Sequence, residues 1–111
     1  MLVSRDYWIV KGESGAAAAQ NVDHAVPANQ DVYLRYLYVA SSDGSRVAYQ
    51  LERPNGTVIF SGYTPDFFDF GMDGMFIPGA PDDDIRLAVS AGAASIVTRA
   101  WMAGIDKPRT H

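Results

Sequence analysis

An alternating segment near the end of the chain constrains the fold more than any other feature. From Ile85 to Ala91 the sequence reads IRLAVSA, with the larger apolar side chains at every second position. A period of two is the pattern of a β-strand that buries one face. Residues 78–81 just before it read PGAP, which is incompatible with helix and with regular strand pairing. A short strand over 75–77 therefore enters a tight corner, and a longer strand leaves it.

Turn residues divide the rest of the chain into further short strands. Runs rich in strand-forming residues occur at 7–10, 22–26, 32–39, 46–53, 57–60 and 95–103, in addition to 75–77 and 85–91. The sequence Arg53-Pro54-Asn55-Gly56 has the residues that a type I turn favours, which predicts a β-hairpin. About eight short strands joined by turns predict one all-β domain over residues 1–111, a single antiparallel β-sandwich or jelly roll. We expect residues 104–111 to form a short polar tail.

The strongest strand signal lies at 32–39 and is apolar at both alternating sets of positions. Leu34 lies on one face with Val32, Tyr36 and Tyr38, while Tyr33, Leu37 and Val39 lie on the other. A strand of a two-layer sandwich buries only one face, so we expect the second face to contact another subunit. The candidate interface residues are Tyr33, Arg35, Leu37, Val39, Arg86, Arg99 and Trp101.

Composition argues against several classes of protein. The net charge is −4 and the pI is about 4.8, whereas a nucleic-acid-binding domain normally carries a basic face. No stretch is apolar enough to span a bilayer, and the first fifteen residues lack the pattern of a signal peptide. We therefore expect a soluble protein that is made in a cytoplasm and binds neither nucleic acid nor membrane.

Residues suited to metal binding or catalysis are few. The chain has no cysteine, and its two histidines, His24 and His111, are interpreted as solvent-exposed side chains. The acidic run at 82–84 lacks the spaced ligands of a calcium loop and is interpreted as a solvated turn. No Ser-His-Asp set or Gly-x-Ser-x-Gly elbow is evident. The sequence thus predicts no metal, no cofactor and no enzymatic activity.

An aromatic, acidic segment at 61–74 is interpreted as a loop with two possible roles. Tyr63, Asp66, Phe67 and Phe68 form a candidate ligand loop, because carboxylates beside aromatic rings are typical of sugar sites. Aromatic loop residues also commonly cap the end of a sandwich. A ligand- or carbohydrate-binding sandwich module, such as an accessory domain of a phage fibre or tail, is therefore the alternative function.

The second half of the chain resembles a known group of proteins. An aromatic loop is followed by Asp73-Gly74-Met75-Phe76, by Pro78-Gly79-Ala80-Pro81, by the strand from Ile85, and by a last strand rich in Ala, Ser and Val. With the segment before it, from Val26, this order resembles small virion proteins of tailed bacteriophages, especially capsid decoration or cement proteins. The chain departs from their pattern at residues 82–84, where it has three aspartates.

The resemblance implies a structural function. A decoration protein is a compact β-subunit, frequently a trimer, that binds the major capsid protein lattice and strengthens the head. It uses no cofactor and performs no chemistry. We therefore expect a homo-oligomer, a trimer by this resemblance, located on the capsid surface of a virion and made in the host cytoplasm.

Overall fold

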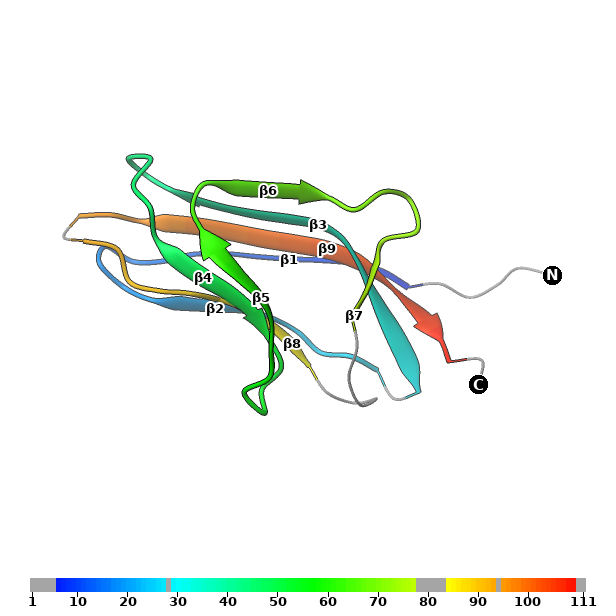
Figure 1. Cartoon of the computed structure of the whole chain (residues 1–111). Coiled ribbons are helices and arrows are strands. Elements are labelled where there is room, and N and C mark those ends of the chain that lie inside the picture. Colours follow the sequence, from blue (N-terminus) through cyan, green and yellow to red (C-terminus); the bar gives the residue numbers. More distant parts are fainter. Residues whose placement is uncertain (1–5, 28, 78–83, 94, 110–111) are drawn as a thin grey trace.

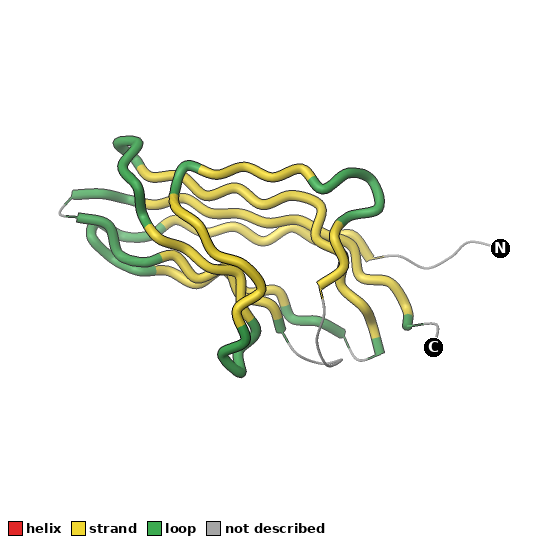
Figure 2. The backbone as a smooth tube through the Cα atoms, in the orientation of Figure 1, coloured by secondary structure: helices red, strands yellow, loops and turns green. Residues whose placement is uncertain are grey.

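Two antiparallel β-sheets pack face to face in the computed structural model of the chain (Figure 1). The structure describes residues 6–27, 29–77, 84–93 and 95–109. Within these ranges the chain consists of strands and connecting loops, and no helix is present (Figure 2). The prediction of an all-β sandwich is therefore confirmed, with two layers of strands around one core.

The two sheets divide the strands without regard to sequence order. One sheet has the order β1 (Asp6–Glu13), β9 (Thr98–Pro108), β3 (Gln30–Ser41) and β6 (Asp66–Asp69), with β7 (Met75–Ile77) also paired to β3. The other has the order β2 (Gln20–His24), β8 (Ile85–Val89), β4 (Ala48–Glu52) and β5 (Val58–Tyr63). Because β7 and β8 belong to different sheets, the chain passes from one layer to the other between Ile77 and Ile85. The corner predicted at residues 78–81 lies outside the described residues.

Alternation in β8 places its apolar side chains in the core, as predicted. Ile85 and Leu87 are fully buried and Val89 is 2% exposed. Leu87 lies opposite Val22 on β2 and Leu51 on β4, so these three form one apolar row across the sheet. The β4–β5 hairpin is also present, and the amide of Gly56 donates to the carbonyl oxygen of Arg53 at 2.9 Å. Gly56 adopts a φ of 95°, which favours glycine at this turn position.

The predicted division of β3 into two faces is wrong for the residues after Leu34, because a β-bulge interrupts the alternation of the strand. Leu34 pairs with Gly104 but Tyr36 pairs with Ala103, so Arg35 is an extra residue in the strand. The bulge moves the following side chains to the opposite face. As a result Leu34 and Leu37 both point into the core and are fully buried.

Three segments differ in extent from the sequence-based expectation. Residues 66–69, expected in a loop, form the strand β6 along part of β3. The last strand continues to Pro108, and Gly104, Ile105 and Asp106 are buried within it rather than in a polar tail. β1 also extends three residues beyond the predicted end at 10, pairing along its length with β9. Long-range pairing therefore extends both outer segments of the chain beyond their local sequence signal.

Leu87 tests the core assignment directly. We expect Leu87→Ala to cost about 2 to 5 kcal/mol of unfolding free energy, since it leaves a cavity between two sheets. Its melting temperature should fall by roughly ten degrees or more. The neighbouring Arg86→Ala removes only a partly exposed ion pair with Asp23 and should cost less than about 1 kcal/mol. Calorimetry of both variants checks the strand register, and the reverse ranking would show that it is inverted.

Candidate functional site

The outer face of the five-stranded sheet carries a cluster of four aromatic rings. Tyr36 and Tyr38 come from β3, Trp101 from β9 and Phe67 from β6. Tyr38 lies opposite both Trp101 and Phe67 in the strand pairing. The ring centroids of neighbouring members lie 6.0 to 6.4 Å apart, a spacing at which aromatic pairs attract one another. Phe67 nevertheless remains 58% exposed, so the cluster is open to solvent.

The bulge at Arg35 is what turns these tyrosines outward. Without the extra residue, Tyr36 and Tyr38 would share the face of Leu34 and enter the core. With it, they join Tyr33 on the outside, and the guanidinium of Arg35 lies 5.2 Å from the centroid of the Tyr36 ring. The same residue therefore separates the aliphatic core from the aromatic surface.

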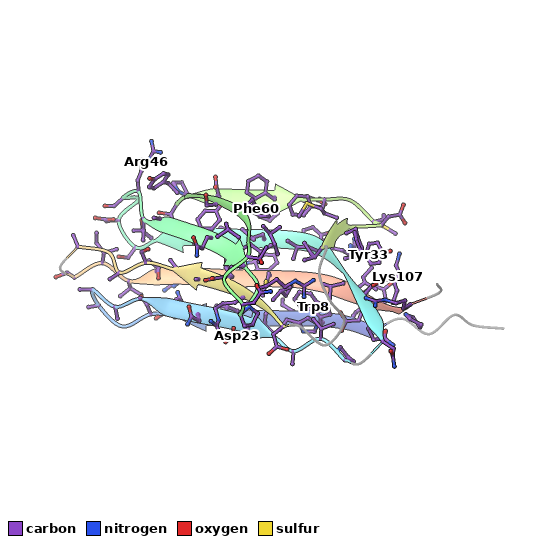
Figure 3. All side chains as sticks on the ribbon, turned by 60° about the horizontal axis from the view of Figure 1, so that its bottom comes forward. Trp8, Asp23, Tyr33, Arg46, Phe60 and Lys107 are labelled. Carbon is purple, nitrogen blue, oxygen red and sulfur yellow. The ribbon has the colours of Figure 1, made fainter. Side chains whose placement is uncertain are left out.

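Cationic side chains surround the aromatic cluster. The ammonium of Lys107 lies 4.3 Å from the centroid of the Tyr33 ring, and the two residues are side by side in Figure 3. Arg99 pairs with Glu13 at 2.8 Å in an exposed position next to Trp101. The Lys107 contact is a cation–π interaction and the Arg99 contact is an ion pair, so basic groups lie on this face although the whole chain is acidic.

Shallow hollows flank the rings on this face. One of about 300 Å³ lies where Ala103 leaves space between Ile9 and Tyr36. Another of about 480 Å³ lies between Lys11 and Trp101. The face is therefore uneven, with large rings beside depressions into which protruding side chains of a partner could fit.

The structure brings four of the seven candidate interface residues onto this face. They are Tyr33, Arg35, Arg99 and Trp101. Leu37 and Val39 are fully buried in the core, so they are not available to a partner. Arg86 lies on the outer face of the other sheet, where it pairs with Asp23 at 2.8 Å. The sequence therefore identified part of the surface but joined to it residues from elsewhere.

The candidate ligand loop does not form one site. Phe67 points outward into the aromatic cluster, whereas Phe68 packs against Phe60 at 5.8 Å between the ring centroids. Asp66 accepts a hydrogen bond from the hydroxyl of Tyr49 on the opposite sheet. Tyr63 lies apart at the end of β5, with the guanidinium of Arg46 at 4.7 Å from its ring centroid. Alternation within β6 separates side chains that are adjacent in sequence.

The Tyr49 contact is a polar link between the sheets rather than a catalytic pair. Burial, together with the hydrogen bond to Asp66, raises the pKa of Tyr49 above its ordinary value. The phenol therefore stays neutral and donates to the carboxylate. Gly62 leaves room for this bond, since a Cβ atom there would lie 2.8 Å from Oδ2 of Asp66.

A second polar link, which the sequence did not reveal, joins His24 to Asp106. His24 was expected to be exposed but is only 8% exposed, and its Nε2 lies 3.0 and 3.1 Å from the two carboxylate oxygens of Asp106. The Trp8 indole donates to the same carboxylate at 3.0 Å and stacks on the His24 ring with centroids 3.8 Å apart. Gly104 makes this possible, because a Cβ atom there would lie 2.5 Å from the Trp8 ring.

This link resembles part of a catalytic triad, but its surroundings are those of a structural contact. Among the described residues, His24 hydrogen-bonds only to Asp106, and no serine or threonine hydroxyl reaches its ring. Within the same ranges no three acidic or histidine side chains are grouped as for a metal ion. His111 and two of the three aspartates of the 82–84 run lie outside the described residues. The link connects β2 of one sheet with β9 and β1 of the other.

Comparisons with known proteins found no relative of the chain. No family model matches the chain, and neither the curated proteins nor the solved structures include a match. Of the described residues, none belongs to a helix that could cross a membrane. The most distinctive features of the described structure are the two outer faces of the sandwich and the buried polar links between the sheets.

Replacing Asp106 tests whether the buried link stabilises the fold. We expect Asp106→Asn to cost about 3 kcal/mol or more, since it removes a desolvated charge that holds two donors. Asp23→Asn, which affects the exposed pair with Arg86, serves as the matched control and should cost about 0 to 1 kcal/mol. Urea unfolding of both variants measures the difference. Equal costs would contradict the assignment of Asp106 as a stabilising link.

Proposed function

We propose that the chain is a structural virion protein without enzymatic activity, of the type that decorates the capsid of a tailed bacteriophage. In this proposal the outer face of the five-stranded sheet is the assembly surface, where copies of the chain meet. The observation that carries the proposal is the amount of apolar side chain exposed there. Tyr7 is 65% exposed, Ile9 59%, Phe67 58% and Phe76 49%.

These side chains lie on three strands of one face. Tyr7 and Ile9 are on β1, Phe67 on β6 and Phe76 on β7, with the partly exposed ring of Trp101 on β9 between them. Large continuous apolar patches are uncommon on proteins that remain monomeric, and they commonly mark sites of association. Tyrosine, tryptophan and arginine are also the residues that contribute most to binding energy at interfaces.

A trimer is consistent with the exposed apolar surface of the five-stranded sheet and with the resemblance to decoration proteins. Three copies that meet through this face would bury the aromatic cluster and leave the outer faces of their four-stranded sheets in solvent. Closed symmetry also limits growth, whereas an open contact would form filaments. Three subunits that bind a lattice together hold it more tightly than one subunit does, because the later contacts form at high effective concentration.

The oligomeric state is the first test. Light scattering should give a mass of about 36 kDa, three times the 12.1 kDa of one chain. The double variant Trp101→Ala, Phe67→Ala should be monomeric at the same concentration, because truncating central aromatic residues typically costs about 2 kcal/mol or more each. Tyr63→Ala, an exposed ring on the other sheet, is the control and should remain trimeric. A monomeric wild-type chain would contradict the assembly surface.

Binding to capsids is the second test. The wild-type chain should co-sediment with empty heads of the phage that encodes it, and the heads should then resist higher temperature. The monomeric double variant should bind much more weakly, since it loses the gain from multivalent contact. A wild-type chain that stays in the supernatant, at concentrations where it is trimeric, would show that it assembles but does not decorate the head.

A further inference from the structure

A groove on the outer face of the four-stranded sheet is not used by the proposed assembly. It measures about 710 Å³, within the range of roughly 300 to 1,000 Å³ that is usual for small-ligand sites. Its walls and floor include Asn21, Gln50, Ser61, Tyr63, Ala88 and Ser90. It lies on the side of the sandwich opposite to the aromatic cluster.

Strand pairing arranges the polar side chains of the groove in one row. Asn21 on β2 lies opposite Ala88 on β8, which lies opposite Gln50 on β4, which in turn lies opposite Ser61 on β5. Strands are about 4.8 Å apart, so the row extends about 14 Å across the sheet. That length accommodates two or three linked sugar rings. The small side chain of Ala88 leaves the space between the two amides open.

The polar side chains of this row have unused hydrogen-bond donors and acceptors. Among the described residues, none bonds to the side chain of Asn21, Gln50 or Ser61. An amide offers both donors and an acceptor, and a hydroxyl does the same. Sugar hydroxyls also both donate and accept, so a row of this kind complements them.

An aromatic ring stands beside the row. Tyr63 pairs with Ala48 in the hairpin, two residues along the strands from the pair of Ser61 and Gln50 and on the same face. It is 53% exposed, and the guanidinium of Arg46 lies against its ring. The apolar C–H face of a sugar ring can pack on such a side chain while its hydroxyls reach the amides.

The charge of the groove indicates the class of ligand. Among the described residues that line it, none has a carboxylate, ammonium or guanidinium group. Its two ionisable residues are Tyr49 and Tyr63, and the hydroxyl of Tyr49 is already engaged with Asp66. The next row of the same face along the strands holds Asp23, Arg86 and Glu52, and its one cation, Arg86, pairs with Asp23 at 2.8 Å. Within the row from Asn21 to Ser61 an anionic ligand would find no cation to offset the loss of its hydration, since Arg46 lies against Tyr63 and not in the row.

We propose that this groove binds a neutral oligosaccharide of two or three rings, laid across the four strands. A peptide added as a strand would pair along the edge of β2 or β5 and would not lie across the row, so the row itself offers side chains and no unpaired backbone of β8 or β4. The proposal does not depend on the assembly function, since the two faces share no residues.

Ligand-observed NMR on the full chain tests the proposal. The probes are maltotriose, cellotriose, mannotriose and chitotriose at millimolar concentration, with a heparin tetrasaccharide as the anionic comparison. At least one neutral probe should show saturation transfer from the wild-type protein. Gln50→Ala should weaken its binding roughly tenfold, the loss expected for a hydrogen bond of about 1.4 kcal/mol. Ala88→Trp, which fills the groove, should abolish it.

Controls distinguish the groove from the rest of the surface and from misfolding. Met72→Ala, an exposed apolar side chain outside the groove, should bind the same probe as wild type. Thermal unfolding identifies any variant that is not folded, and Ser61→Trp, on β5 at the end of the same row, then replaces Ala88→Trp. The proposal is overturned if no neutral probe binds, if binding survives filling of the groove in a folded variant, or if the heparin probe binds more tightly through Gln50.

Discussion

The extra residue in β3 decides which side chains of this central strand face the core and which face solvent. A strand of strict alternation would place Leu37 and Val39 in solvent if Leu34 were buried. Exposing two aliphatic side chains would lose several kcal/mol of stabilisation from apolar burial. The two tyrosines buried in their place would need hydrogen-bond partners for their hydroxyl groups. The bulge at Arg35 removes this conflict, because all the aliphatic residues of the strand then face one way.

Polar links hold the two layers in a fixed relation near both ends of the sandwich. His24 and Asp106 join β2 to β9 at one end, and Gln20 donates to the hydroxyl of Thr98 at 2.8 Å at the other. Apolar contacts between sheets are not directional, so they tolerate sliding of one layer over the other. A buried hydrogen bond tolerates it poorly, since each lost partner leaves a desolvated group. We therefore interpret these links as what fixes the relative position of the sheets.

Local patterns in the sequence were sufficient for the parts of the fold that local chemistry determines. The alternation around Leu87 and the turn ending at Gly56 gave a buried strand and a hairpin, both confirmed. The bulge was missed because nothing in the residues around Arg35 distinguishes an inserted residue from a strand with two apolar faces. The bond between His24 and Asp106 was missed because 82 positions separate them. Only the fold brings such residues together.

The two outer faces of the sandwich differ in what they gain from contact. Burying the aromatic face removes large apolar area from water, which is favourable wherever the partner is complementary. Burying the groove face would desolvate amides and hydroxyls, which stabilises a complex only if each finds a partner of its own. A flat protein surface seldom supplies such partners, whereas a ligand rich in hydroxyl groups does. A subunit held through its aromatic face would therefore keep the row from Asn21 to Ser61 in solvent, where a soluble ligand can reach it.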